Sequence, residues 1–368
     1  MSHSLLFLPD ISGYTEFVQT TEVEHSQHVI AELLEVMMEA NSLDLQLAEV
    51  EGDALFFYRE APLPSMEMLL AQVERIFSAF YSHLKLLETN RICPCNACAT
   101  APNLQLKIVA HCGPIQFLEL QGKRKPFGPA VIQVHRLLKN SVDSNNYVLL
   151  SKDLTDELNL PENYRSRLFD FASGSDTYDG NELPYLYSKI AKEELKLQPF
   201  RQVQKTHFDD APNLKIKLDF PVPAAELFEY ITNYNYRYLW ADGVDRYEFN
   251  ENTVTRVGSE HVCVINDKHL NFVTVVKEGE PGQLVYGELT STAPFLRELY
   301  QFFIVTPRND HSCTLESEIF VRTGVFQKLI WSLIMKRIFD RNLHKVLGQL
   351  LDFVKQQKAA QVKVSPTP

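Results

Sequence analysis

A polar stretch near the middle of the chain limits most strongly how this sequence can fold. Residues 191–210 show no clear hydrophobic period and contain Pro199, whereas the residues on either side are strongly patterned. Such a stretch indicates a linker between separately folded domains. The 368 residues are too many for one typical domain and suit two. We therefore expect a first domain over 1–192, a linker over 193–211, a second domain over 212–360 and a disordered tail over 361–368.

The first domain is expected to alternate strands with amphipathic helices. The apolar run at residues 5–8 predicts a buried strand, and residues 25–40 and 66–87 predict long helices. Gly52 and Asp53 lie in the turn of an expected hairpin. Its strands are residues 43–47 and 54–58; further strands are expected at 104–110 and 115–120, and a helix at 131–138. This order predicts an α+β fold with helices packed on one sheet.

The second domain starts with a strictly alternating strand at residues 214–220. A short helix with proline near its start is expected at residues 223–231. Six strand-like segments follow, at 253–257, 261–265, 271–276, 283–288, 300–307 and 313–322. A long helix over residues 326–358 is expected to close the domain.

Composition and charge exclude some classes of partner. The net charge is -11 and the pI about 5.5, which argues against nucleic acid because a phosphate backbone attracts a basic face. The first residues lack the cationic start of a signal peptide, and no apolar run reaches the roughly 20 residues of a membrane span. We expect a cytoplasmic protein, whose six cysteines are thiols or metal ligands rather than disulfides.

Two carboxylates stand at positions that suit a divalent cation. Asp10 follows the first expected strand, and Asp53 lies in the hairpin turn. Mg²⁺ and Mn²⁺ prefer such oxygen ligands and keep water and phosphate oxygens at their other positions. Taken singly, however, an aspartate beside a glycine in a turn is equally consistent with ordinary turn chemistry.

The residues around both aspartates resemble class III adenylate and guanylate cyclases. The segment Phe7-Leu8-Pro9-Asp10-Ile11-Ser12-Gly13-Tyr14-Thr15 is similar to the opening of that family's domain. Three further similar segments follow in the family's order, Glu51-Gly52-Asp53-Ala54, 107–114 and 128–137. The resemblance covers about residues 5–140 and implies a ferredoxin-like cyclase-type sandwich that acts as a homodimer on a nucleoside triphosphate.

The resemblance also implies roles for individual residues. Asp10 and Asp53, with Ile11 beside Asp10, would hold two Mg²⁺ or Mn²⁺ ions, and Arg136 would act catalytically by stabilising charge on the reacting phosphate across the dimer. The expected nucleotide-binding residues are Ser12, Gly13, Tyr14, Thr15, Glu49 and Lys125, of which the first four would cradle phosphates through the backbone.

This sequence departs from the family's pattern at several positions. The family's ribose-orienting asparagine falls on Ile132, whose side chain cannot form hydrogen bonds. Glu49 looks like the guanylate branch, whereas Lys125 matches neither branch, and the family's late triphosphate-binding lysine has no counterpart that we can place. The resemblance therefore implies metal binding with altered recognition of base and ribose.

A compact cysteine cluster is the second conspicuous motif. Cys93, Cys95 and Cys98 follow the second long helix, and Cys112 or His111 could complete a tetrahedral Zn²⁺ site with them. An iron–sulfur cluster, or redox-sensitive thiols without any metal, are the alternatives.

The second domain resembles the START-like helix-grip fold, also described as SRPBCC or polyketide cyclase/dehydrase. The similar segments are 221–228, 233–240 with Val244, and 257–259. The resemblance implies a curved sheet around the long helix, with a cavity for a hydrophobic small molecule. The expected lining is Phe272, Tyr286, Phe302, Phe320 and Trp331, although these aromatics could equally fill a core. His261, His269 and His344 lack metal-site spacing, so we expect no function from them.

Three hypotheses about function follow. In the first, a hydrophobic ligand in the second domain regulates nucleotide cyclisation by the first, as in a signalling protein. In the second, the first domain binds nucleotide or serves as a scaffold without catalysis. In the third, the chain is a ligand carrier whose first half only dimerises.

Overall fold

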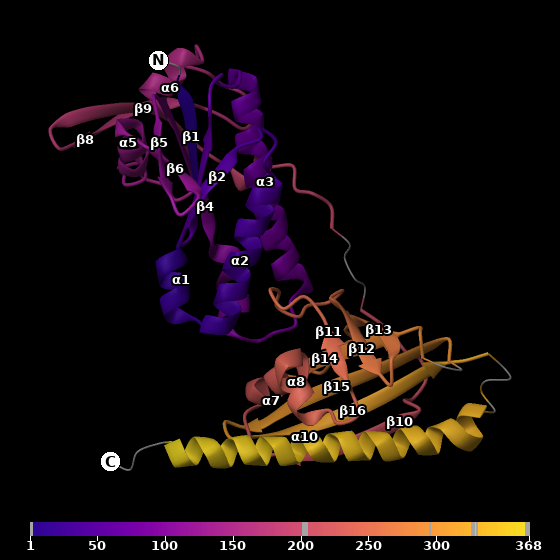
Figure 1. Ribbon diagram of the computed structural model, residues 1–368. Helices are drawn as coiled ribbons and strands as arrows, with labels where there is room; N and C mark the ends of the chain where they lie inside the picture. The colour runs from indigo at the N-terminus through magenta and orange to yellow at the C-terminus, as the bar shows by residue number, and fades with distance from the viewer. Residues whose placement is uncertain (1–2, 201–204, 294–295, 325–327, 329, 365–368) are drawn as a thin grey trace. The chain divides into compact units, whose positions relative to one another are not determined.

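A computed structural model describes residues 3–200, 205–293, 296–324, 328 and 330–364 (Figure 1). The chain divides into two compact units. The first unit comprises residues 1–88 and 100–200, and the second comprises residues 89–99 and 201–368. The segment 89–99, which carries three of the cysteines, therefore belongs with the second unit although it lies within the first half of the sequence.

A mixed sheet of seven strands forms the centre of the first unit, in the order β2-β3-β1-β4-β7-β9-β8. Only β4 and β7 are parallel to each other. The strands are β1 (Ser4–Ser12), β2 (Gln46–Glu51), β3 (Ala54–Arg59), β4 (Gln105–Gly113), β7 (Tyr147–Ser151), β8 (Ala172–Tyr178) and β9 (Asn181–Lys189). Strands β5 (Gln116–Leu120) and β6 (Lys123–Phe127) form a separate hairpin.

Helices cover both faces of this sheet, which explains the uninterrupted apolar run in its central strand. The side chains of residues 5–8 in β1 are all fully buried, as expected for a strand covered on both sides. Leu6 and Leu8 share a core with Val134 and Leu137 of α5 (Pro129–Leu137). Figure 1 shows the long helices α2 (Val23–Glu39) and α3 (Met66–Asn90) on the other side. Shorter helices are α1 (Tyr14–Thr20), α4 (Asn96–Thr100) and α6 (Lys152–Glu157).

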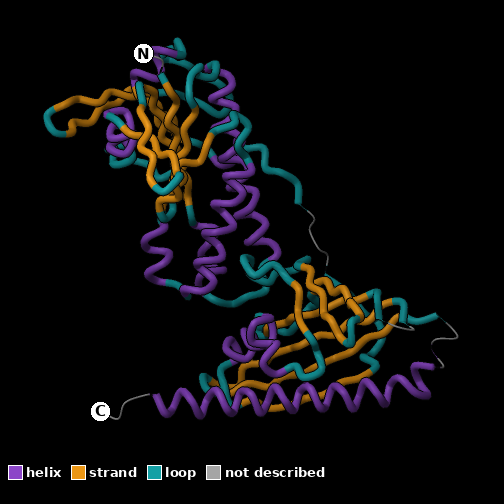
Figure 2. Tube along the Cα trace, viewed as in Figure 1, coloured by secondary structure: helices purple, strands orange, loops and turns teal. Residues whose placement is uncertain are grey.

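The second unit is built on an antiparallel sheet in the order β10-β16-β15-β14-β13-β12-β11 (Figure 2). Its strands are β10 (Leu214–Phe220), β11 (Arg246–Glu248), β12 (Glu260–Ile265), β13 (Lys268–Val275), β14 (Leu284–Thr290), β15 (Glu298–Asn309) and β16 (Ser312–Arg322). Helices α7 (Ala224–Thr232), α8 (Tyr234–Trp240) and α10 (Lys336–Val364) all contribute to one core on one face of this sheet. A π-helical turn, Trp331–Met335, precedes α10.

The amphipathic pattern of α10 accounts for its position along the sheet. Leu343, Leu347 and Leu350 are almost fully buried and recur at spacings of three and four residues. They pack with residues of β10, β15 and β16, and the helix runs along the sheet (Figure 2). In the part of the chain that the structure describes, no helix has both the length and the apolarity that a membrane crossing requires.

Most of the helices and strands that were predicted from a regular hydrophobic pattern are present, but their first and last residues differ from the predicted ones. The strand predicted at 253–257 is wrong, because these residues form a loop in which Val254 and Val257 are buried. The segment 233–240, for which no helix was predicted, contains α8. The predicted start of the last helix, Phe326, lies outside the described residues.

Candidate functional site

The local backbone brings Asp10 and Asp53 to neighbouring positions in the first unit. Gly52 has φ +70°, a left-handed conformation that suits glycine in the two-residue turn between β2 and β3. Asp10 of β1 lies opposite Ala54 of β3, the residue after Asp53. The backbone N–H of Ile11 donates a hydrogen bond to the carbonyl oxygen of Asp53 at 3.1 Å. This bond holds Asp10 of β1 beside Asp53 in the β2–β3 turn.

Both carboxylates are in an environment that disfavours their negative charge. Burial, together with the charge of Asp10, raises the pKa of Asp53 to about 6. Burial also raises the pKa of Asp10, which the nearby charge of Lys107 opposes. Two partly buried carboxylates that repel each other are suited to hold a cation. The donor set thus fits a hard divalent ion such as Mg²⁺ or Mn²⁺.

Lys107 is a charged neighbour of Asp10 that sequence reasoning missed. It lies directly opposite Asp10 on β4, and its Nζ is 3.4 Å from Asp10 Oδ1. Its ammonium group therefore supplies one positive charge to the pair. A divalent ion bound at Asp10 would meet this charge, so Lys107 lowers the affinity of the site for metal.

The turn after β1 is compatible with phosphate binding, but one residue opposes it. Gly13 has φ +91° and leads into α1, whose first backbone N–H groups have no partners within the helix. The hydroxyl oxygen of Ser12 is buried without a hydrogen-bond partner, so it could accept or donate one to a ligand. Tyr14 is half-buried and Thr15 exposed. Glu16, also exposed, places a negative charge in the first turn of α1.

The two residues expected to select the base form an ion pair with each other. Lys125 Nζ of β6 lies 2.9 and 2.8 Å from the carboxylate oxygens of Glu49 on β2. A second contact of β2 joins His135 Nε2 of α5 to Glu51 at 3.0 Å. The structure therefore brings together Glu49 and Lys125, which are 76 residues apart in sequence.

Arg136 and Ile132 both lie on α5, and neither side chain contacts Asp10 or Asp53. The guanidinium of Arg136 is paired with Asp179 in the turn between β8 and β9. Ile132 is 54% exposed, and it belongs to a group of exposed apolar side chains on neighbouring elements of this unit. We call this group the apolar patch; its members are Leu118, Leu120, Phe127 and Ile132.

Three of the four cysteines of the predicted zinc site lie together, whereas Cys112 does not. The Sγ atoms of Cys93, Cys95 and Cys98 all lie within 4.8 Å of one another. Cys112 is not a member of any metal-capable group among the described residues. It lies in β4 opposite Leu5 and lines a pocket with Asp153 and Glu157. Including Cys112 in the predicted zinc site was therefore wrong, since β4 fixes it in the interior of the first unit's sheet, between β1 and β7.

The predicted aromatic pocket is also wrong as a single site. Tyr286 and Trp331 are buried in the core beneath α10. Phe302 and Phe320 belong to a separate cluster on the other face of the sheet, with Phe208 stacked 4.0 Å from Phe320. Neighbouring residues on a strand point to opposite faces, so these four side chains cannot line one cavity. Phe272 is half-buried and stacks on His261 at 5.0 Å.

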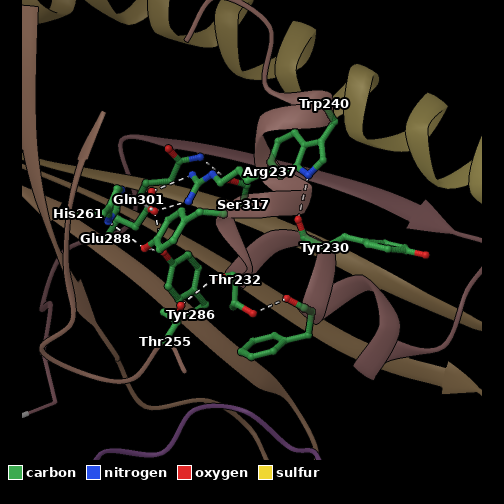
Figure 3. Close-up of polar contacts among 12 residues, drawn as sticks. Tyr230, Thr232, Arg237, Trp240, Thr255, His261, Tyr286, Glu288, Gln301 and Ser317 are labelled. Carbon is green, nitrogen blue, oxygen red and sulfur yellow. Dashed lines mark hydrogen bonds and ion pairs between the residues drawn. The ribbon is translucent and has the colours of Figure 1, made fainter. Parts of the chain in front are cut away.

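A buried polar core lies in the second unit, and sequence reasoning missed it (Figure 3). We define it as Tyr234, Arg237, His261, Tyr286 and Glu288. Both guanidinium ends of Arg237 contact the Glu288 carboxylate, with Nη2 2.9 Å from Oε2. The hydroxyl of Tyr286 donates to Glu288 Oε1 at 2.6 Å, and Tyr234 joins Tyr286 and His261 at 2.9 and 2.8 Å.

The charges in the polar core are set by burial and by the ion pair. Burial opposes ionisation of Glu288, but the charge of Arg237 overrides it and lowers the pKa of Glu288 below its usual value. Burial lowers the pKa of His261 to about 4, so this histidine is neutral at pH 7. Arg237 Nε is buried without a hydrogen-bond partner. One sequence signal was available, because Glu288 lies in core-facing register with Tyr286 on an alternating strand and such a charge requires a partner.

Comparisons with known proteins give partial matches. The family described as protein of unknown function, DUF2652, matches residues 30–147, which is less than half of the chain. The uncharacterised protein Rv2561/Rv2562 of Mycobacterium tuberculosis is 31% identical over 123 residues, 33% of this chain and 57% of that protein. This chain thus spans a little over half the length of that curated relative.

Similar solved structures include cyclase domains over about half of the chain. The guanylate cyclase domain of RhGC from Catenaria anguillulae in complex with GTP has 15% identity and a TM-score of 0.38, covering 51% of this chain and 97% of that one. The adenylyl cyclase CyaB from P. aeruginosa has 15% identity and a TM-score of 0.38, covering 55% and 97%. A norcoclaurine synthase mutant of Thalictrum flavum covers 39% of this chain and 94% of its own, with 11% identity and a TM-score of 0.32. At these scores the similarities carry no argument about function.

Proposed function

We propose that the first unit is a divergent class III cyclase-type domain that binds a nucleoside triphosphate with Mg²⁺ or Mn²⁺ through Asp10 and Asp53. The observation that carries the proposal is that these two half-buried carboxyl groups are neighbours, one on β1 and one in the β2–β3 turn, and that the N–H of Ile11 donates to the carbonyl oxygen of Asp53 at 3.1 Å. Divalent ions at such a site would stabilise the negative charge of a triphosphate and of a departing pyrophosphate.

Cyclisation is the reaction that this arrangement supports best. The 3′-hydroxyl oxygen of the nucleotide attacks the α-phosphorus, and a bond forms between them as the bond to the β-phosphate oxygen breaks. Pyrophosphate leaves, and the hydroxyl proton passes to solvent. The turn from Ser12 to Thr15 holds phosphate oxygens through its backbone N–H groups and the Ser12 hydroxyl.

Base recognition falls to Glu49 and Lys125 in this proposal. Because the two side chains pair with each other, a base must either displace that ion pair or bind along its edge. A carboxylate accepts hydrogen bonds and an ammonium donates them. Together they suit a base edge that presents a donor beside an acceptor, as all four nucleobases do.

The proposal includes a second copy of the chain. The apolar patch carries four exposed apolar side chains on β5, β6 and α5, and such patches mark association surfaces. In a dimer that uses this patch, Arg136 of α5 would exchange Asp179 for the phosphates bound by the partner.

The proposal assigns the second unit a START-like, ligand-binding and regulatory role. Its support is the seven-stranded antiparallel sheet with α10 packed along one face. The ligand would be a hydrophobic small molecule whose binding changes the geometry of the dimer.

The test is incubation of the purified chain with Mn²⁺ and each of ATP, GTP, CTP and UTP, with cyclic nucleotide and pyrophosphate measured by mass spectrometry. We expect a cyclic product, reduced about 100-fold or more by Asp10→Ala. Asp143→Ala is the matched control, because it removes an exposed carboxylate of the same unit away from the site. Absence of cyclic product with all four nucleotides would contradict catalysis.

A second candidate function is nucleotide binding without turnover. Lys107 favours it, because an ammonium group 3.4 Å from Asp10 weakens metal binding. Ile132 favours it as well, because it offers no hydrogen bond to a ribose. Equilibrium dialysis with labelled nucleotide distinguishes cyclisation from binding alone. Binding without cyclic product supports the second candidate, whereas formation of cyclic product contradicts it.

A further inference from the structure

We propose that Cys93, Cys95 and Cys98 hold a structural Zn²⁺ ion in the segment that follows α3 and includes the start of α4. The proposal is independent of any nucleotide chemistry. It rests on the convergence of three thiols, on their burial and on the anchoring of this short segment within the second unit.

The sulfur atoms are already close to the geometry of a zinc site. All three Sγ atoms lie within 4.8 Å of one another. Tetrahedral zinc with Zn–S bonds of about 2.3 Å places its sulfur ligands about 3.8 Å apart, so small side-chain rotations suffice. The cysteines are thiols and not disulfides. Three thiols that converge within six residues cannot all be satisfied by one disulfide, whereas one zinc ion takes all three as thiolates.

The backbone around the cluster supports thiolate ligands. The N–H of Cys98 donates to Cys95 Sγ at 3.3 Å, an interaction that becomes stronger when the sulfur is negatively charged. The N–H of Ala99 donates to the carbonyl oxygen of Cys95 at 3.0 Å and closes the turn that carries the last two ligands. This compact turn points Cys95 and Cys98 toward the same centre as Cys93.

The surroundings favour a structural site over a catalytic one. Cys93 and Cys98 are buried, with 7% and 8% exposure, and they pack with Val254 of the second unit. The N–H of Val257 donates to the carbonyl oxygen of Asn90 at 2.9 Å, just before the cluster. The metal would therefore fix residues 89–99 against the loop at 254–257. The fourth zinc ligand would be a histidine nitrogen or a water molecule, in the way that Cys₃His sites are completed.

Metal content is the first test. The full chain is purified under reducing conditions without chelator, loaded with Zn²⁺ and desalted, and its metals are measured by mass spectrometry. We expect about one zinc per chain, lost in Cys95→Ser and in Cys98→Ser. Cys263→Ser and Cys313→Ser, which remove buried thiols of the same unit, are the matched controls and should retain the zinc. No zinc in the wild-type chain, iron in its place, or full retention in the Cys95→Ser/Cys98→Ser double variant would overturn the proposal.

A second measurement needs no variant and so does not depend on whether a variant folds. Arg91 is exposed directly before the cluster, which makes it a trypsin site. Chelation of zinc from the wild-type chain should speed cleavage after Arg91, and added Zn²⁺ should reverse the effect. X-ray absorption on the zinc-loaded chain should show three sulfur ligands. An equal rate of cleavage with and without chelation of zinc would contradict the assignment. So would a zinc ion with only nitrogen and oxygen ligands.

Discussion

At the scale of single residues, the two units use buried charge in different ways. Asp10 and Asp53 are partly buried carboxylates that repel each other, so they are suited to a cation. Glu288 already has its cation in Arg237, so its charge is satisfied within the chain. The first arrangement is suited to bind a ligand, whereas the second stabilises one particular packing of α8 on the sheet.

His261 gives a residue-scale prediction about pH. Burial lowers its pKa to about 4 from the ordinary 6.5, so between these values the folded chain binds fewer protons than the unfolded chain. The free energy of unfolding should therefore fall as the pH is lowered from about 6.5 to about 4, by up to about 3 kcal/mol from this residue. The charged and titratable groups around it are Tyr234, Arg237, Tyr247 and Glu288.

Urea unfolding at several pH values checks this prediction. His261→Gln should flatten the slope of stability against pH in this window, while His344→Gln, which replaces an exposed histidine, should leave it unchanged. An unchanged slope in His261→Gln would show that this ring is not the group responsible.

At the scale of elements, the polar core joins α8 to β14 and predicts strong coupling between them. Arg237→Met should cost about 3–5 kcal/mol, because it leaves Glu288 buried without its cation. The Arg237→Met/Glu288→Gln double variant should recover part of that loss. Denaturant unfolding of both single variants and of the double variant measures the coupling. Arg246→Met, in an exposed ion pair with Glu248, is the control and should change stability little. Additive losses would contradict the coupling.

The helices and strands also show which parts of the fold could be predicted from the sequence. Strand β1 and helices α2, α3 and α5 were predictable because their apolar residues recur with the right period. Helix α8 was missed because its sequence mixes aromatic and polar residues; its capping residue Asn233, whose side chain accepts from the N–H of Asn235 at 3.0 Å, was the available signal. The polar core was missed because its members come from three separate segments, α8, β12 and β14.

The candidate site, like the fold, was only partly predictable from the sequence. Motif spacing predicted that Asp10 and Asp53 lie near each other; Glu49 and Lys125 also contact each other, and their role in nucleotide binding stays a prediction. Lys107 could not be found from spacing, because its position beside Asp10 follows from the register of β1 on β4. The aromatic pocket failed because residue type alone does not say which face of a strand a side chain occupies.

At the scale of the whole molecule, the apolar patch predicts self-association. Leu120→Glu or Ile132→Glu places a charge at a side chain that is 58% or 54% exposed, so neither change should disturb the fold of the isolated chain. We expect the wild-type chain to be a dimer by light scattering and these variants to be monomers. Met68→Glu, an exposed apolar residue on α3 outside the patch, is the control and should remain dimeric. A monomeric wild-type chain would contradict the dimer.

The most direct test of the central claim is a titration of Mn²⁺ binding in the presence of a nucleoside triphosphate, followed by the paramagnetic resonance of the free ion. The account predicts that the wild-type chain binds up to about two Mn²⁺ ions with the nucleotide. It predicts that Asp10→Ala/Asp53→Ala loses them, that Asp143→Ala keeps them, and that Lys107→Met binds them more tightly. Equal uptake by the wild type and the Asp10→Ala/Asp53→Ala variant, or no uptake by the wild type, would contradict the account.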